Sequence, residues 1–452
     1  MSLFLTNLEI PIVTTSLVSI TGDLGGFDNV GWVISSYLLG YVATFGRKLM
    51  FSTSIVIFIC FSAGYGAAQT LTQLIALRAF QGVGGGGCFA LSTAIVVELV
   101  PPENVPAAVP ALALAIFAIP KNFPNRGRAD CPRTTWKEKF DKGSRAKVDV
   151  LGAALLLLAT LSMTAGFEEA DSRFPWKLAY VISLLTISGL LWMDLVIWER
   201  HITIYRATIE PVLPWRFFQN RAMLSLLLNA VFLGGPWFVS VFQLPQKFQL
   251  VHGSSGVKAG LQTMPFTFAA PLGSAFSALV AGKLKVPVIY PVLFAGTLQT
   301  VGLALLASLP ESSRIVPRAY GFQIIAGFGC GINILTLLLI VPFVVGSRDK
   351  AIGMGAVSQL RVMSGAIGLS IVTSVFNSYT KPRISELLQA SHATIDSVQS
   401  VQSISNMDPL DQERLKTTLA RGYNLKMYVL CAFAALQIPA ALLMWRKKQL
   451  MV

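Results

Sequence analysis

The sequence predicts an all-helical membrane protein with about thirteen membrane-spanning helices, and three observations support that fold class. Of 452 residues, 54% are hydrophobic and 13% are charged, and the mean hydropathy is +0.63. Soluble domains carry about 25% charged residues. Uncharged runs of about 20 residues recur, which is the length that crosses a bilayer as a helix. Alternating ten-residue patterns are absent, and open sheets do not cross lipid. These observations exclude a soluble enzyme, a disordered regulator and a disulfide-stapled secreted domain.

The expected spans are apolar runs separated by short polar or basic segments. A run of 20 residues rises about 30 Å as a helix, which is barely one hydrocarbon thickness. The two shortest runs have about 15 residues and rise only about 22 Å. The expected spans are Met1–Ile20, Val30–Thr44, Leu49–Ala68, Leu71–Val100, Val105–Ile119, Val148–Phe167, Lys177–Trp198, Ala222–Phe242, Gly260–Ala281, Val286–Leu309, Arg318–Val345, Ala351–Phe376 and Leu425–Trp445.

The basic balance of the chain, 36 Lys and Arg against 22 Asp and Glu, is interpreted as topological. The basic residues form short clusters between apolar runs, and basic loops stay in the cytoplasm. No soluble basic domain is present to bind nucleic acid. The five cysteines and three histidines show no metal-site or disulfide spacing, so neither a metal nor another cofactor is expected.

Ionisable residues inside apolar spans are functional candidates by default. Glu9 lies in the first span, where a low-dielectric setting favours the protonated carboxyl, so we expect it to carry a proton or bind substrate. The alternative is a solvated position near the interface. Arg78 lies in the fourth span and is expected to act in a gate or in proton coupling. The alternative is a cation that snorkels to one face of the membrane.

A second group of candidates lies in the later spans and is expected to contact substrate. Gln359 and Arg361 interrupt the next-to-last span, where they line an aqueous path or pair with a neighbouring helix. Trp237, Phe242 and Gln243 form an aromatic and polar patch that suits a flat organic compound. A belt of aromatic residues at the interface explains the patch equally well.

Glycine-rich runs occur in three of the spans. Gly82-Val83-Gly84-Gly85-Gly86-Gly87 lacks the strand and the Lys-Ser/Thr that a phosphate-binding loop requires. Small residues in membrane helices permit close helix contacts, so we predict such contacts here, at Gly327–Gly331 and at Gly365–Gly368.

These segments resemble motifs of the major facilitator superfamily, and more narrowly of the fourteen-helix drug:proton antiporters of fungi. The resemblance covers nearly the whole chain, and it implies gating or motif roles for Arg47, Lys48, Gln81 and Gly82. The matching segments are Leu8–Leu17 with Glu9, Phe45-Gly46-Arg47-Lys48, Arg78–Gly86, Leu244–Gln249 with the following Gly253-Ser254 and Ala259–Pro265, and Gly353–Gly368.

Two departures from the family pattern stand out. The acidic residue expected before Gly46-Arg47-Lys48 is absent, because Tyr41-Val42-Ala43-Thr44 stands there. After Pro101-Pro102-Glu103 the chain continues at once into what looks like the start of the family's sixth helix, so the fifth helix is missing. The comparison therefore indicates a shortened protein or an incomplete gene product.

The domain organisation follows from the spans and the resemblance. Residues 1–120 form a shortened N-terminal helical half, and 121–147 form a cytoplasmic basic loop with nine Lys or Arg and three Asp or Glu. Residues 148–199 form two linker helices. Residues 200–452 form the C-terminal half, with a polar loop at 377–424 whose Asp408–Arg421 part is expected to form an amphipathic or solvated helix. If basic segments lie in the cytoplasm, counting crossings forward from Arg47-Lys48 places the loop 121–147 outside, whereas counting back from the basic C-terminus places it in the cytoplasm. We expect the count from the second half to give the true topology. Val105–Ile119 would then be poorly seated in the membrane.

The sequence thus predicts a monomeric, proton-coupled secondary transporter, not an enzyme, that exports small amphipathic organic compounds such as drugs or secondary metabolites. Its partners would be substrate, protons and the lipid bilayer. The expected location is the plasma membrane, with the vacuolar membrane as the alternative. The competing hypothesis is a shortened, transport-inactive member of the same family.

Overall fold

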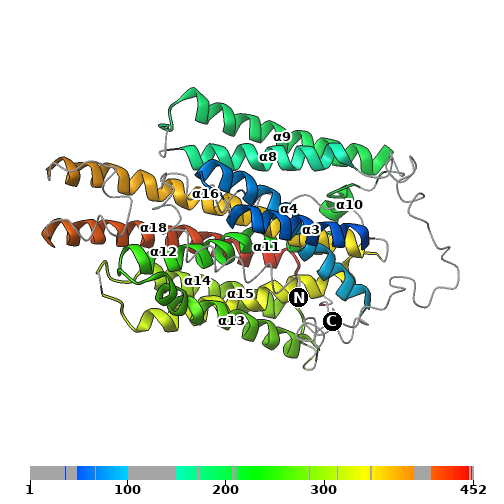
Figure 1. The fold of residues 1–452 in the computed structure, drawn as a ribbon. Helices are drawn as coiled ribbons and strands as arrows, with labels where there is room; N and C mark the ends of the chain where they lie inside the picture. Colours follow the sequence, from blue (N-terminus) through cyan, green and yellow to red (C-terminus); the bar gives the residue numbers. More distant parts are fainter. Residues whose placement is uncertain are drawn as a thin grey trace.

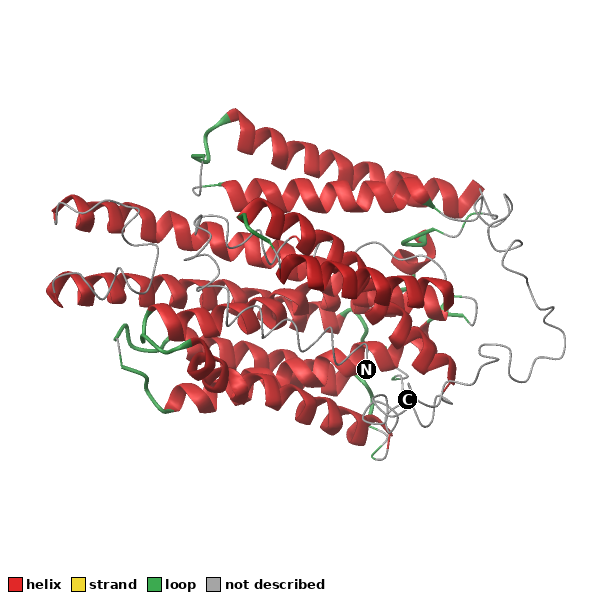
Figure 2. Cartoon of the chain, viewed as in Figure 1, coloured by secondary structure: helices red, strands yellow, loops and turns green. Residues whose placement is uncertain are grey.

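The computed structural model describes residues 48–66, 68–99, 149–170, 174–205, 211–282, 286–312, 314–346, 349–390 and 409–446, with Ser36 and a few single positions. In these residues the chain forms helices that run side by side as a bundle, and no strand occurs among them (Figures 1 and 2). Among the described residues, eight spans are long and apolar enough to cross a membrane. They are α8 (Val150–Glu169), α9 (Ala179–Tyr205), the continuous α11–η4–α12 span (Arg221–Leu250), α13 (Gly256–Gly282), α14 (Ile289–Ala307), α15 (Arg318–Val344), α16 (Lys350–Ala390) and α18 (Pro409–Leu442).

The eight spans confirm the eight expected after residue 147, and two earlier helices match as well. Helices α3 (Lys48–Gly66) and α4 (Leu71–Leu99) pack against each other. At Gly84 of α4 a Cβ atom would lie 2.6 Å from the backbone nitrogen of Phe58, so the predicted close contact is present. The expected spans Met1–Ile20, Val30–Thr44 and Val105–Ile119 lie outside the described residues.

Helices α8 and α9 form an antiparallel pair along one edge of the bundle, at the top of Figure 1. Asp149 caps α8 by accepting a 2.7 Å hydrogen bond from the backbone nitrogen of Gly152. Large apolar side chains such as Met193 and Ile197, each 62% exposed, cover the outer face of α9. Exposed apolar surface on this scale indicates a lipid-facing helix. On its other side α8 packs against α16.

Small residues allow α15 to pack closely between α13 and α14. Gly327 faces the carbonyl of Phe266 on α13, and a Cβ at Gly329 would lie 2.9 Å from the carbonyl oxygen of Ala295 on α14. Any larger residue at these positions would force the backbones apart. The close contacts predicted for the Gly327–Gly331 run are therefore present.

Helices α16 and α18 are longer than the apolar runs that predicted them. Part of the expected polar loop 377–424 is helical: α16 continues to Ala390 and α18 begins at Pro409, while 391–408 lie outside the described residues. Both helices extend beyond the rest of the bundle at the left of Figure 1. The helix expected over Asp408–Arg421 is confirmed as the first part of α18, whereas the continuation of α16 to Ala390 was missed because hydropathy marks only the buried or lipid-facing part of a helix.

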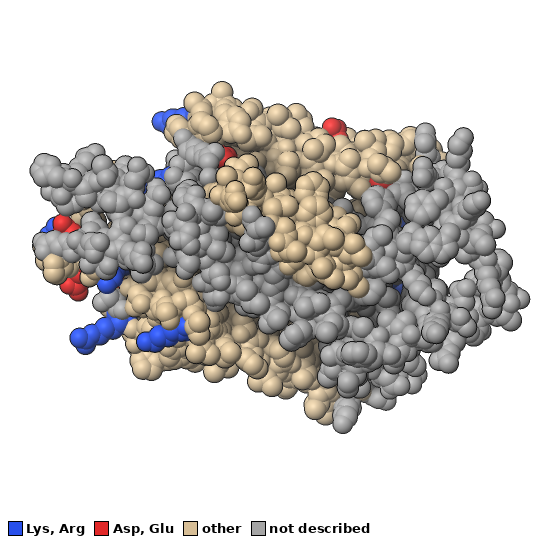
Figure 3. All heavy atoms as spheres, viewed as in Figure 1, with Lys and Arg blue, Asp and Glu red and all other residues tan. Residues whose placement is uncertain are grey.

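On the face that Figure 3 shows, most of the described Lys, Arg, Asp and Glu atoms lie toward the ends of the bundle. At the end opposite the extensions, the short helix α10 (Trp215–Gln219) is joined to the start of α16 by a 2.6 Å ion pair between Arg216 and Asp349. This distribution suits a protein whose middle lies in hydrocarbon.

A π-helical turn interrupts the first span of the C-terminal half. The span runs through α11 (Arg221–Gly234), η4 (Gly235–Val239) and α12 (Ser240–Leu250). Pro236 has no N–H to donate, and a π turn accommodates the missing hydrogen bond within a continuous helix. Such turns occur frequently at functional sites.

Candidate functional site

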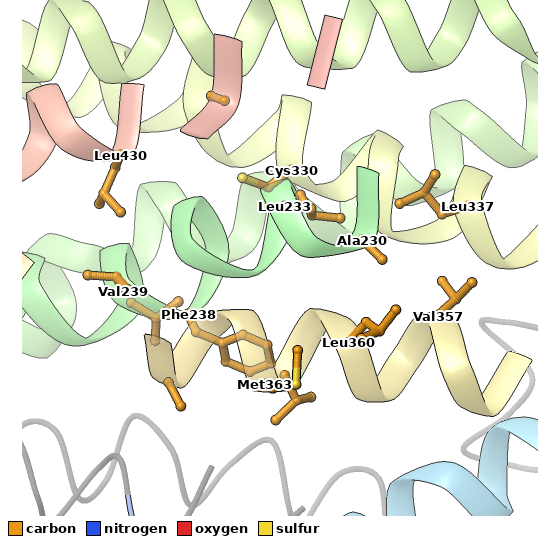
Figure 4. Close-up of a cluster of buried hydrophobic side chains, with 14 of the residues drawn as sticks. Ala230, Leu233, Phe238, Val239, Cys330, Leu337, Val357, Leu360, Met363 and Leu430 are labelled. Carbon is orange, nitrogen blue, oxygen red and sulfur yellow. The ribbon is translucent and has the colours of Figure 1, made fainter. Parts of the chain in front are cut away.

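The π turn crosses α16 at close range. A Cβ at Gly234 would lie 2.8 Å from the backbone nitrogen of Gly365, and a Cβ at Gly368 would lie 3.0 Å from the Cα of Gly235. Figure 4 shows the ring of Phe238 directed at α16. Glycine is therefore required on both helices, as predicted for Gly365–Gly368. The crossing fixes the side chains that flank it on η4, α12 and α16.

The aromatic and polar patch expected to contact substrate lies on η4 and α12. Trp237 is half-buried and stacks on Phe266 of α13, with ring centroids 5.6 Å apart. Phe242 is buried in the main hydrophobic core. Gln243 is also buried, with 3% of its surface exposed, and its amide oxygen accepts a hydrogen bond from Lys426.

The other expected substrate residues lie on α16 beside the same crossing. The backbone carbonyl of Arg361 contacts Gly234, and the Arg361 side chain is 3% exposed. Gln359 is half-buried two positions earlier. The structure thus places all the expected substrate residues on two spans, the continuous α11–η4–α12 span and α16, that pack together at η4, and their roles stay predictions.

A buried ammonium forms the centre of a polar cluster that the sequence interpretation missed. Lys426 of α18 is 4% exposed and donates a 2.7 Å hydrogen bond to Oε1 of Gln243. Its Nζ lies 3.8 Å from the ring centroid of Phe376 and 4.6 Å from that of Tyr423. Aromatic faces attract a desolvated cation. We call Glu168, Gln243, Ser370, Phe376, Tyr423 and Lys426 the Lys426 cluster.

The acidic member of this cluster is Glu168, at the end of α8. It is 2% exposed, and neither carboxyl oxygen has a hydrogen-bond partner among the described residues. Lys426 and Ser370 interact with Glu168 electrostatically, but the Ser370 hydroxyl donates to the Ala366 carbonyl. Among the described residues, no ion pair within 4.0 Å joins Glu168 to Lys426. An ionisable pair that is buried yet not in contact has room to change its separation or its protonation.

Two further contacts join the same helices. Ser374 of α16 donates a 3.3 Å hydrogen bond to the carbonyl of Ala170, directly after α8. A second buried lysine, Lys247 of α12, donates a 2.8 Å hydrogen bond to Oδ1 of Asn424 on α18. The linker helix α8 and the helices α12, α16 and α18 therefore meet through polar groups at one end of the bundle.

The sequence contained a signal for Lys426 that its interpretation did not use. Lys426 lies within the expected span Leu425–Trp445, where an ionisable residue is a candidate by the same rule that selected Glu9 and Arg78. Glu168 directly follows the expected span Val148–Phe167, so it falls in the connection to the next span. Its burial depends on the packing of α8 against α16, which no local pattern reveals.

The expected coupling residues of the N-terminal half are only partly described. On α4, Arg78 is 4% exposed, and its Nη1 donates a 2.8 Å hydrogen bond to Oε1 of Gln81. Burial at this level disfavours the snorkelling alternative. Gln81 is fully buried and Gly82 is buried beside it. Helix α4 packs against α16, which also bears Gln359 and Arg361.

The remaining expected residues cannot be placed. Glu9 and Arg47 lie outside the described residues, and Lys48 begins α3 but its side chain is not among those described. Within the described part of the chain, no group of three or more His, Cys, Asp or Glu side chains gathers as metal ligands would.

Comparisons with known proteins agree with this architecture. The family model of the Major Facilitator Superfamily matches residues 1–119. A bacterial homolog of the human lysosomal transporter Spinster, in an inward-facing and occupied conformation, superposes with a TM-score of 0.57 at 14% identity, covering 98% of this chain and 94% of the other. This likeness shows the fold.

Sequence relatives extend over nearly the whole chain. The MFS-type transporter FPY5 of Fusarium mangiferae is 32% identical over 502 residues, covering 98% of this chain and 82% of the relative. The efflux pump roqT of Penicillium rubens is 24% identical and covers 99% of this chain and 89% of the relative. Together with the helical bundle, these matches establish that the chain belongs to the major facilitator superfamily.

Proposed function

We propose that this protein is a proton-coupled secondary transporter that exports small amphipathic organic compounds. Membership of a transporter superfamily supports transport, and the names of roqT and of the Multidrug resistance protein 3 of Bacillus subtilis, which is 24% identical, favour efflux. The sequence has no phosphate-binding loop motif, which favours an ion gradient over ATP as the energy source. The observation that carries the proposal is the burial of ionisable side chains in apolar helices.

Proton coupling requires a group that changes charge during the cycle. We assign this role to Glu9, with Arg78 as a fixed cation that favours the ionised form of nearby carboxyls when they release the proton. The hydrogen bond from Arg78 to Gln81 holds the guanidinium in one orientation on α4. Arg47, Lys48 and Gly82 take the gating roles that the family motifs imply.

Substrate contact is assigned to the residues around the crossing of η4 and α16. The half-buried ring of Trp237 offers an apolar face, while Gln243, Gln359 and Arg361 offer hydrogen-bond donors and acceptors. Phe242 supports this wall from the core. A compound with an apolar body and a few polar groups matches such a wall.

The architecture suits alternating access by a monomer. Residues 1–120 and 200–452 would form the two halves that rock against each other, and 148–199 would supply two linker helices. The basic loop 121–147 would face the cytoplasm. We assign the plasma membrane as the location, because export from the cell requires it.

Efflux from proteoliposomes with an imposed pH gradient tests this function against a panel of amphipathic compounds. Glu9→Gln should abolish gradient-driven export and leave substrate binding in place. Arg78→Lys keeps the positive charge but replaces the planar guanidinium, which donates hydrogen bonds in a fixed geometry, and it should also abolish transport. Export that is unchanged by Glu9→Gln, at equal expression, would contradict the coupling role.

A second candidate function is a shortened family member without a transport cycle. The alignment with the Fusarium relative spans 502 positions, more than the 452 residues of this chain, so that relative has internal segments that this chain lacks. The missing fifth helix after Glu103 would be one of them. Transcript sequencing across the codons for Thr44 and Phe45, and for Glu103 and Asn104, separates the candidates: recovered coding sequence favours transport.

A further inference from the structure

The linker helix α8 carries, near its end, a carboxyl group that the proposed cycle leaves unused. Glu168 is 2% exposed, and neither of its carboxyl oxygens has a hydrogen-bond partner among the described residues. A buried carboxylate without hydrogen bonds loses its hydration uncompensated, whereas the protonated carboxyl has no charge to solvate. The free energy of this part of the bundle therefore depends on whether Glu168 carries a proton.

The charged groups that act on Glu168 come from α8 itself and from α18. Lys426 of α18 attracts the carboxylate form, and the neighbouring Glu169 repels it. Helix α16, which packs against α8, presents the Ser370 hydroxyl, and no charged side chain of α9 acts on Glu168 in the described part of the chain. Lys426 is therefore the cation that compensates an ionised Glu168.

Lys426 bears its charge among neutral partners. Its ammonium donates a hydrogen bond to Oε1 of Gln243, and its Nζ lies 3.8 Å and 4.6 Å from the ring centroids of Phe376 and Tyr423. These contacts stabilise a cation but do not neutralise it. An ammonium has three donors, so Lys426 keeps donors with which to pair with a carboxylate. An ionised Glu168 supplies the negative charge that the other partners lack.

Glu168 lies close to the end of α8 and to exposed chain. It precedes the C-cap residue Ala170 by two positions, which is a rise of about 3 Å along the helix axis. Beyond it, residues 174–178 of the connection to α9 are exposed. With the basic loop 121–147 assigned to the cytoplasm, this connection would lie on the outer face of the membrane. A proton from the outer solution then has a short route to Glu168.

We propose that Glu168 is a second proton-binding group of the transporter, with Lys426 as its counter-charge and Gln243 as the link to substrate. While Glu168 is protonated, Lys426 stays on the amide oxygen of Gln243. When the carboxyl O–H bond breaks, the proton passes to water, and the carboxylate draws the ammonium away from Gln243. The Gln243 oxygen then becomes available to substrate, so proton release and substrate binding favour each other, as exchange of the two requires.

This inference rests on the proposed proton-coupled export and gives the linker helices a role in coupling. Infrared spectroscopy tests proton binding without transport. The C=O stretch of protonated carboxyls is recorded on the full-length protein in lipid while the pH is stepped, and the spectrum of Glu168→Gln is subtracted. The difference should contain a protonated-carboxyl band that disappears as the pH rises. In Lys426→Met the band should persist to higher pH, because the cation that stabilises the carboxylate is gone.

Glu169→Gln is the matched control, because Glu169 is the next residue of the same helix and is half-buried. This variant should retain the Glu168 band. A difference spectrum without a titrating band, or a band that Lys426→Met leaves at the same pH, would overturn the proposal.

Substrate binding tests the link through Gln243. For a panel compound that the unaltered protein exports, affinity should rise with pH across the infrared transition by up to about tenfold per pH unit, the limit for release of one proton. Glu168→Gln should bind as weakly as the unaltered protein does at low pH, without this pH dependence. Glu168→Asp, which keeps an ionisable carboxyl, should retain it. A pH dependence that survives in folded Glu168→Gln would overturn the proposal.

The two experiments separate failure of this inference from failure of the proposed function. If no compound of the panel is exported, the proposed function fails, and the infrared band still decides whether Glu168 binds a proton. If export proceeds under the pH gradient but the band is absent, the inference is wrong and the coupling role assigned to Glu9 is unaffected.

Discussion

Two buried polar clusters, one within the C-terminal half and one that joins this half to α8, differ in how completely their polar groups are paired. The amide cluster, Gln299, Asn333 and Gln437, joins α14, α15 and α18, and all three side chains have no exposed surface. Gln437 and Gln299 exchange two hydrogen bonds of 3.0 and 3.2 Å, and Gln437 also bonds the carbonyl of Phe232. Only Oδ1 of Asn333 is without a partner in the described part of this cluster.

The Lys426 cluster is buried to a similar degree but carries opposite charges that are not in contact. Glu168 has two carboxyl oxygens without hydrogen bonds among the described residues, and Lys426 has one hydrogen bond and two aromatic faces. A satisfied neutral network stabilises a fold, whereas incompletely paired charges in a membrane protein are characteristic of function. We therefore expect the two clusters to respond oppositely to substitution.

Gln437→Leu should have the largest effect on stability. The substitution removes the acceptor of Asn333 Nδ2 and both hydrogen bonds between Gln437 and Gln299. Gln299 then keeps only the bond from its Nε2 to the carbonyl of Gly329. The expected loss is about 2–3 kcal/mol, given the modest value of hydrogen bonds inside membrane proteins. Thermal unfolding in detergent measures it, and an unchanged midpoint would show that the amide cluster does not stabilise the bundle.

Lys426→Met should change stability much less than Gln437→Leu. Replacing a buried ammonium by an apolar side chain of similar length removes the cost of its desolvation, which offsets the lost hydrogen bond to Gln243. The buried carboxyl of Glu168 takes up a proton, so no uncompensated charge is left. We expect a shift within about 1 kcal/mol in either direction. A loss as large as that of Gln437→Leu would place Lys426 among the structural residues, and the comparison would fail.

The substitution Glu168→Gln tests whether Glu168 and Lys426 act as an energetically coupled pair. The Gln side chain keeps the shape but not the charge, so its effect should depend on whether the ammonium is present. In a double-mutant cycle with Lys426→Met we expect a coupling energy of about 0.5–1.5 kcal/mol. A coupling near zero would mean that the two groups do not act as a pair.

Ser277→Ala should have the smallest effect. The Ser277 hydroxyl and the Thr336 hydroxyl lie 2.6 Å apart between α13 and α15, and Thr336 has a second partner in the carbonyl of Ile332. Because Thr336 keeps its hydrogen bond to Ile332, the loss of the neutral bond to Ser277 should cost about 0.5–1 kcal/mol of stability. Thermal unfolding of Ser277→Ala, measured in parallel with Gln437→Leu, gives the stability loss for a single neutral hydrogen bond. The losses in the two clusters are compared with this value.

Much of the fold was predictable because hydrocarbon imposes length and polarity on each helix. The eight spans after residue 147 lie close to the apolar runs that predicted them. The π turn was not predicted, because a Gly-Gly-Pro sequence in a span is equally compatible with a kink. The polar start of α18 was predicted from the amphipathic pattern of Asp408–Arg421, whereas the extension of α16 was not, because polar helix turns outside the membrane look like loop in a hydropathy pattern.

The candidate site was less predictable, because its contacts join distant parts of the chain. Gln243 was singled out from its neighbourhood, but its partner Lys426 lies 183 residues later. Gln359 and Arg361 were recognised as polar interruptions of a span, whereas their position beside η4 depends on the glycine contacts at Gly234 and Gly365. Local pattern identifies polar residues in spans, and only tertiary packing shows which of them meet.

Efflux from proteoliposomes under an imposed pH gradient, measured side by side for Lys426→Met and Gln437→Leu, tests the central contrast most directly. Both variants are assayed below the lower unfolding midpoint and at equal protein content. The contrast predicts that Lys426→Met loses at least about tenfold in transport rate, equivalent to about 1.4 kcal/mol in the barrier, while Gln437→Leu stays near the rate of the unaltered protein. Normal transport by Lys426→Met, or an equal loss in folded Gln437→Leu, would contradict it.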